Sequence, residues 1–134
     1  MAKMTELTQL TVQIENKPGT LASLGEALAK DKVNILAFAA DEGEGHNRVR
    51  LATDNSAKAK EILTGLNLQV SEAEVIGIVL KNKPGTLARA ARKLAGADIN
   101  INYSYSGAEE GSKKQVVVFG VNDAKQAAKA LKKS

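Results

Sequence analysis

The chain has 134 residues, of which 43% are hydrophobic and 25% are charged, a composition typical of a globular protein that is soluble in water. It contains no cysteine, which excludes disulfides, thiolate metal ligands and a cysteine nucleophile. Residues 1–10 are too polar for a signal peptide, no apolar run has the length of a membrane span, and the net charge of +4 is modest. We therefore expect a cytoplasmic protein that binds neither a membrane nor a nucleic acid.

The first predicted elements alternate between strand and helix patterns. Apolar and polar residues alternate in Leu10–Ile14, which predicts a strand with one face in water. Pro18 and Gly19 then indicate a turn, and apolar residues recur at helical spacing over Thr20–Lys30. Next come a strand, a polar hairpin, a strand, a helix and a strand, at Val33–Ala39, Asp41–Asn47, Arg48–Thr53, Ser56–Leu63 and Leu68–Val70.

The heptapeptide NKPGTLA occurs at Asn16–Ala22 and again at Asn82–Ala88, 66 residues later (82 − 16). Residues 12–35 and 78–101 are identical at 11 of 24 positions, where unrelated segments would share roughly one or two. The same order of predicted elements is repeated at Ile76–Leu80, Thr86–Ala95, Ile99–Tyr105, Ser106–Gln115, Val116–Val121 and Ala124–Lys132. We interpret the chain as two copies of one small domain, residues 1–72 and residues 73–134.

Each copy has the order β-α-β-β-α, which indicates a ferredoxin-like βαββαβ unit with an antiparallel sheet and helices on one face. The predicted fold class is therefore α+β, built from two such units. In the first copy, Leu68–Val70 supplies the last strand. The second copy runs out after its helix. Either Met4–Leu7, which aligns with Val70–Ala73, supplies its fourth strand, or its sheet has three strands.

A strand, then NKPGTLA, then an apolar helix and Val33–Ile35 resembles the ACT domain, the small amino-acid-sensing module of biosynthetic enzymes and their regulators. The resemblance covers nearly the whole chain, which is similar to free-standing tandem ACT proteins without a catalytic domain. It implies a non-catalytic regulatory protein whose amino acid effector binds at the strand-to-helix loop, near a neighbouring unit. The ligand-binding residues that it implies are Asn16, Pro18, Gly19, Thr20, Leu21 and Asn34, and in the second copy Asn82, Pro84, Gly85, Thr86, Leu87 and Asn100.

The chemistry of the repeated loop suits an amino acid. The start of a helix offers N–H groups without intrahelical partners and a partial positive charge, both of which favour a carboxylate. An asparagine side chain both donates and accepts, so Asn16 or Asn34 suits an ammonium as well as a carboxylate. The alternative is that Asn-Lys-Pro-Gly is only a turn into a helix, with the asparagine bonded to nearby backbone.

Catalysis and metal binding have little support. The single histidine, His46, lies in a polar hairpin, and no nucleophile–base pair or metal-ligand cluster is visible. Asp41, Glu42 and Glu44 form a carboxylate group without the spacing of an EF-hand. We therefore predict no enzyme activity, no catalytic residue, no metal site and no cofactor.

Two other functions share this order of elements. RNA-binding ferredoxin-like domains stack bases on aromatic side chains of the sheet, and the third strands here lack that pattern. In a strand over Ile99–Tyr105, Tyr103 and Tyr105 lie on the same face as Ile99 and Ile101. This favours a place for both rings in the core or at the edge of a pocket. A pure assembly module without a ligand is the other alternative.

Assembly is expected in any case. One sheet face of the second copy is apolar and is too large to remain in water. The residues on this face are Val75, Gly77, Val79, Val116 and Val118. We predict that the other unit or a second chain covers this face, most simply in a homodimer. A regulated enzyme is a possible further partner, and the sequence does not identify it.

Overall fold

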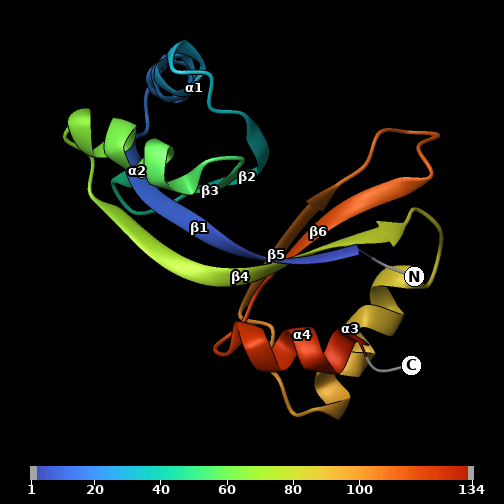
Figure 1. Cartoon of the computed structure of the whole chain (residues 1–134). Helices are drawn as coiled ribbons and strands as arrows, with labels where there is room; N and C mark the ends of the chain where they lie inside the picture. The colour runs from blue at the N-terminus through green and yellow to red at the C-terminus, as the bar shows by residue number, and fades with distance from the viewer. Residues whose placement is uncertain (1–2, 133–134) are drawn as a thin grey trace. The chain divides into compact units, whose positions relative to one another are not determined.

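The computed structural model describes residues 3–132, which form six strands and four helices (Figure 1). In chain order they are β1 (Lys3–Glu15), α1 (Thr20–Lys30), β2 (Ile35–Glu42), β3 (His46–Thr53), α2 (Ser56–Gly65), β4 (Val70–Lys81), α3 (Thr86–Gly96), β5 (Tyr103–Gly107), β6 (Lys114–Gly120) and α4 (Ala124–Lys132). The chain divides into two compact units, each with a ferredoxin-like α+β fold. We name Thr8–Ala73 the N-terminal unit, and residues 3–7 with 74–132 the C-terminal unit.

The N-terminal unit has the strand order β2-β3-β1-β4, with β3 antiparallel to both of its neighbours. Leu10, Val12 and Ile14 alternate along β1 and point to the buried face, as their spacing predicts. Both helices of the unit pack on this face, α1 with Leu24 and Leu28 and α2 with Ala59 and Leu63. The core is aliphatic throughout.

The C-terminal unit has the order β1-β4-β6-β5, with β6 antiparallel to β4 and β5. Its core packs β4 and β6 against α3 and α4, and Phe119 is its largest fully buried side chain. The first residues of β1 supply its fourth strand, since residues 3–7 belong to this unit and β1 lies beside β4. This confirms the first of the two sequence alternatives, in which Met4–Leu7 completes the second sheet.

Two strands are longer than the sequence pattern indicates. Residues 68–70 and 76–80 are predicted as separate strands, whereas β4 runs unbroken over Val70–Lys81. The intervening segment, Ser71–Glu74, contains no glycine, proline, asparagine or aspartate to turn the chain. β1 is also longer than its predicted strand, because it starts at Lys3 and not at Leu10.

Tyr103 and Tyr105 do not enter the core. In the ladder they lie opposite Gly120 and Val118, whereas the core residues of β6 are Val117 and Phe119. The sequence prediction assumes one regular strand from Ile99 to Tyr105, in which alternate residues share a face. It fails because β5 begins only at Tyr103, and the residues before it do not form a regular strand. Both rings therefore lie on the sheet face away from the helices, partly buried.

The apolar face of the C-terminal unit is largely buried in this structure. Val75 and Val118 have no exposed surface, and Val79 is half-buried. The ring of Tyr103 lies directly against Gly120, where an added Cβ would collide with it. Val116, in contrast, is 40% exposed. That the other unit or a second chain covers this face, Val116 included, stays a prediction.

Candidate functional site

Both copies of the repeated loop enter their helix through a left-handed glycine. The φ angles are +91° at Gly19 and +92° at Gly85, a conformation that side-chain-bearing residues rarely adopt. No side chain of the described residues caps α1 or α3 at these glycines. The first N–H groups of each helix therefore face the loop without an acceptor from a capping side chain.

The threonine after each glycine closes the turn. The Thr20 hydroxyl donates to the carbonyls of Glu15 and Lys17, at O···O distances of 2.7 and 3.1 Å. In the second copy Thr86 makes the equivalent bonds to Lys81 and Lys83, at 2.8 and 3.0 Å. These bonds tie the end of the first strand of each unit to the start of its helix, so the threonine sets the shape of the loop.

The two loop asparagines bind the following hairpin of their own unit. The Asn16 carbonyl oxygen accepts from the Asn47 side-chain amide at 3.2 Å, and its own amide lies 3.5 Å from a carboxylate oxygen of Glu42. In the second copy the Asn82 amide donates to the carbonyl of Ser112 at 2.8 Å. Each asparagine therefore anchors the loop to the hairpin, and its amide has partners within the protein.

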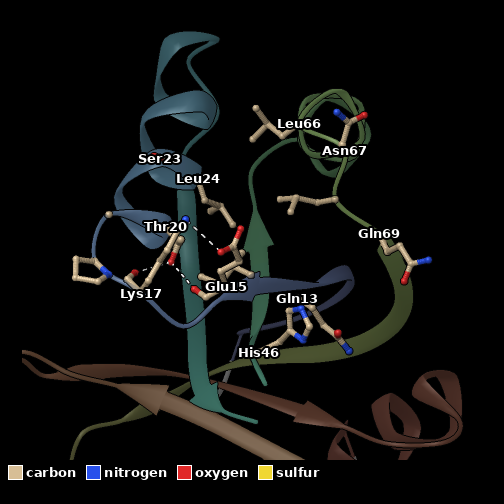
Figure 2. A pocket seen from close by; sticks show the side chains of 14 residues that line it. Gln13, Glu15, Lys17, Thr20, Ser23, Leu24, His46, Leu66, Asn67 and Gln69 are labelled. Carbon is tan, nitrogen blue, oxygen red and sulfur yellow. Dashed lines mark hydrogen bonds and ion pairs between the residues drawn. The ribbon is translucent and has the colours of Figure 1, made fainter. Parts of the chain in front are cut away.

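A cavity of about 610 Å³ opens beside the first loop (Figure 2). Its walls come from the end of β1, the loop, the first turns of α1, the start of β3 and the segment between α2 and β4. The lining residues are Gln13, Ile14, Glu15, Lys17, Pro18, Gly19, Thr20, Ser23, Leu24, His46, Leu66, Asn67, Leu68 and Gln69. Three of the residues that the sequence suggests for ligand binding, Pro18, Gly19 and Thr20, are among them.

The cavity combines an apolar floor with a charged rim. Ile14 and Leu24 are buried beneath it, whereas Leu66 at the C-terminal end of α2 is 45% exposed. At the rim the Lys17 ammonium lies 3.2 Å from the Glu15 carboxylate, and both side chains are more than half exposed. An exposed ion pair of this kind contributes little to stability, so both groups are available to exchange partners with a ligand.

Asn34 lies at the other end of the N-terminal unit. The residue after it, Ile35, pairs with Thr53, whereas Glu15 at the loop pairs with His46. Seven positions of β3 separate the two levels (53 − 46), which corresponds to roughly 23 Å along the sheet. The Asn34 N–H donates to the Asp54 carboxylate at 2.9 Å. Within this unit the structure therefore does not bring Asn34 to the loop.

The corresponding asparagine of the second copy is bound locally. The Asn100 amide donates to Asn102 at 3.0 Å, and the Asn102 amide donates to Asn122 at 2.9 Å. These side chains form a short polar chain at the start of β5. Leu21 and Leu87, which follow the loop threonines, are 42% and 48% exposed, and Leu21 is not part of the cavity lining.

The two helix starts differ in access. A Cβ added at Gly19 would meet no described atom within 4 Å, so the space in front of it is open. The same addition at Gly85 would place the Cβ 3.1 Å from a guanidinium nitrogen of Arg89. The residue equivalent to Arg89 in the first copy is Ser23 (89 − 66), a lining residue of the cavity. The arginine therefore covers the second loop, and the serine leaves the first one open.

The profile of one family, described as the ACT domain pair, matches residues 4–133. The chain belongs to this ACT domain pair family. This confirms the resemblance that the repeated loop suggests, and it covers both copies. The comparison with curated proteins gives no match.

Solved structures extend the likeness of this ACT domain pair. Protein BT0572 from Bacteroides thetaiotaomicron superimposes with a TM-score of 0.86 at 29% identity, over 96% of this chain and 88% of that one. The ligand-free regulatory subunit of aspartate kinase from Thermus thermophilus gives 0.72 at 16% identity, over 97% and 93%. Aspartokinase III of E. coli, in complex with lysine and aspartate, gives 0.61 at 19% identity, over 97% of this chain and 31% of that one.

Other kinds of site find no support in residues 3–132. No group of three or more histidine, aspartate or glutamate side chains gathers there to hold a metal ion. Asp41 lies 4.0 Å from Arg50, and Glu42 lies beside Asn16, so these hairpin carboxylates have other neighbours. None of the described helices is both long enough and apolar enough to cross a bilayer.

The sequence interpretation named three of the fourteen lining residues and missed the others. Leu66, Leu68 and Gln69 follow the second helix of the ACT unit and carry no motif. The topology holds the signal that could have found them. In a βαββαβ unit the last strand lies beside the first, so the segment leading into β4 comes close to the end of β1.

Proposed function

We propose that this protein is a non-catalytic regulatory protein that binds an amino acid in the cavity beside the first loop. The observation that carries the proposal is that a left-handed glycine, an uncapped helix start and one exposed charge of each sign meet at a single opening. An amino acid carries one carboxylate and one ammonium, and this opening offers a partner to each.

The roles follow from charge. The N–H groups at the start of α1, which no side chain caps, and the Lys17 ammonium suit the carboxylate of the ligand, and Gly19 lets it approach the backbone. The Glu15 carboxylate suits the α-ammonium, and the two can pair once Lys17 turns to the ligand. Asn16 and Thr20 then act by holding the loop in shape.

We place the ligand at the first loop in preference to the second. Arg89 lies across Gly85 and would have to move before a ligand reached the start of α3. In the second copy, Asn82 and Pro84 to Leu87 then form the same kind of turn into a helix. A ligand cannot reach this turn while Arg89 lies across it. We further propose that the protein acts in the cytoplasm as a homodimer. By analogy with the regulatory subunit of aspartate kinase from Thermus thermophilus, we propose that it acts on a separate enzyme.

A pure assembly module is the second candidate function, and one observation favours it. Leu36 and Phe38 on β2, the edge strand of the N-terminal unit, are 52% and 51% exposed. Exposed apolar side chains on a strand edge are typical of surfaces that pair with another chain. In this alternative the protein assembles but no amino acid changes its stability.

A thermal-shift screen of the purified chain with the proteinogenic amino acids tests the proposal. A ligand at 100 times its Kd stabilises the folded state by about 2.7 kcal/mol. Gly19→Ala and Gly85→Ala form a matched pair, because both replace a glycine at nearly the same positive φ. We expect a similar loss of stability in both variants, but loss of ligand binding only in Gly19→Ala. Equal binding by both variants, or no shift with any amino acid, would reject the site.

A further inference from the structure

The charges of the cavity limit the ligand. Among its fourteen lining residues, Lys17 is the single lysine or arginine and Glu15 the single carboxylate. The α-carboxylate of an amino acid would pair with Lys17 and its α-ammonium with Glu15. The other polar lining groups are amides, hydroxyls and the imidazole of His46. A ligand with a third charge, on its side chain, would lose water there without gaining an ion partner, which is costly.

The apolar lining points to the kind of side chain. Ile14, Pro18, Leu24, Leu66 and Leu68 contribute aliphatic surface to the cavity. Figure 2 shows Leu66 reaching from the end of α2 toward α1, where Leu24 lies. Leu66 is 45% exposed, so an apolar group placed against it would remove it from water.

We infer that the ligand is an α-amino acid with an uncharged aliphatic side chain. The inference rests on the proposed function and adds the class of ligand. The α-carboxylate lies at Lys17 and the start of α1, the α-ammonium at Glu15, and the side chain packs against Leu66.

Isothermal titration of the full chain with leucine, lysine, aspartate and threonine tests the charge argument. We expect leucine to bind at least tenfold more tightly than the other three. A fifth titrant, 4-methyl-2-oxopentanoate, has the carbon skeleton and carboxylate of leucine but no ammonium. Glu15→Gln should weaken leucine about tenfold but should not weaken this keto acid, because the variant removes the partner of the ammonium and releases Lys17 for the carboxylate.

A pair of surface leucines tests the apolar argument. Leu66→Asn should weaken leucine binding about tenfold, since it removes one apolar wall of the cavity. Leu36→Asn is the matched control, because Leu36 has a similar exposed fraction but lies on β2, outside the lining. It should leave the affinity unchanged. Circular dichroism establishes that both variants are folded.

The outcomes separate the inference from the function on which it rests. If no amino acid binds, the proposed function fails. If lysine, aspartate or threonine binds most tightly, with an affinity that depends on Lys17 but not on Leu66, the proposed function stands and the aliphatic ligand is wrong. An aromatic amino acid that outcompetes leucine would also overturn the inference. The ranking of amino acids by the wild-type chain decides this even if a variant fails to fold.

Discussion

A guanidinium nitrogen of Arg89 lies 3.1 Å from the position that a Cβ on Gly85 would occupy, so the arginine covers the entry to its own helix. The first copy has the same seven-residue loop, but Ser23 stands at the position of the arginine and the space before Gly19 is open. Two loops with identical sequences therefore differ in access because of a residue outside the repeated heptapeptide. The difference bears directly on the number of ligands that one chain binds.

We predict one ligand per chain, and we predict that Ser23→Arg abolishes its binding. The new guanidinium should cover Gly19 as Arg89 covers Gly85. Because the ligand could then not reach the loop, its affinity should fall more than tenfold. Ala22→Arg is the matched control, because it adds the same charge at an exposed neighbouring position of α1 outside the cavity lining. Calorimetric stoichiometry and affinity are the measurements. A stoichiometry of two for the wild-type chain, or equal effects of the two variants, would contradict the prediction.

The threonines that close the loops should differ in their contribution to stability. Thr86 is buried, with 7% of its surface exposed, whereas Thr20 is partly exposed, and both hydroxyls bond to two carbonyls. Each of these carbonyls also accepts a backbone N–H, so replacement by valine removes one of its donors, which costs about 0.5–1.5 kcal/mol. We expect Thr86→Val to lower the free energy of unfolding in urea by an amount in this range, and Thr20→Val to lower it by less. Equal losses would show that burial does not decide the cost.

Much of the fold is readable from the sequence because local rules and tertiary packing agree. The alternation in Leu10–Ile14 and the spacing of Leu24 and Leu28 predict the strand, the helix and their buried faces, and the structure has them. The element order then identifies the ferredoxin-like unit. The repeat supplies a second, independent test of each assignment.

The remainder depends on contacts between segments far apart in the sequence. The repeat aligns Met4–Leu7 with Val70–Ala73 but leaves open whether this segment joins residues 74–132, because strand pairing is decided by the sheet and not by the strand. Tyr103 could not be assigned to a face without knowing that the regular strand begins at that residue. The cavity wall at Leu66 follows from topology and has no motif of its own.

Gly120 should not accept a larger residue. The ring of Tyr103 lies opposite it in the ladder and fills the space that a Cβ would take. We predict that Gly120→Ala lowers the free energy of unfolding by about 1–3 kcal/mol, the usual cost of overpacking. Gly107→Ala, on β5, is the control, because a Cβ there meets no described atom within 4 Å. In the Tyr103→Ala background the cost of Gly120→Ala should largely disappear, and an unchanged cost would mean that strain in the backbone, not the ring, is responsible.

Deletion of residues 1–7 should loosen the C-terminal unit specifically. In that unit β1 is the edge strand beside β4, and its described residues 3–7 supply backbone partners to the sheet. Without them β4 becomes an exposed edge. Amide hydrogen exchange should then show lower protection along residues 74–81. The β2–β3 hairpin is the internal control, because it belongs to the N-terminal unit and pairs with β1 only from Leu10 onward. Uniform loss of protection in both units would indicate global destabilisation, and unchanged protection of β4 would show that the second sheet is stable with three strands.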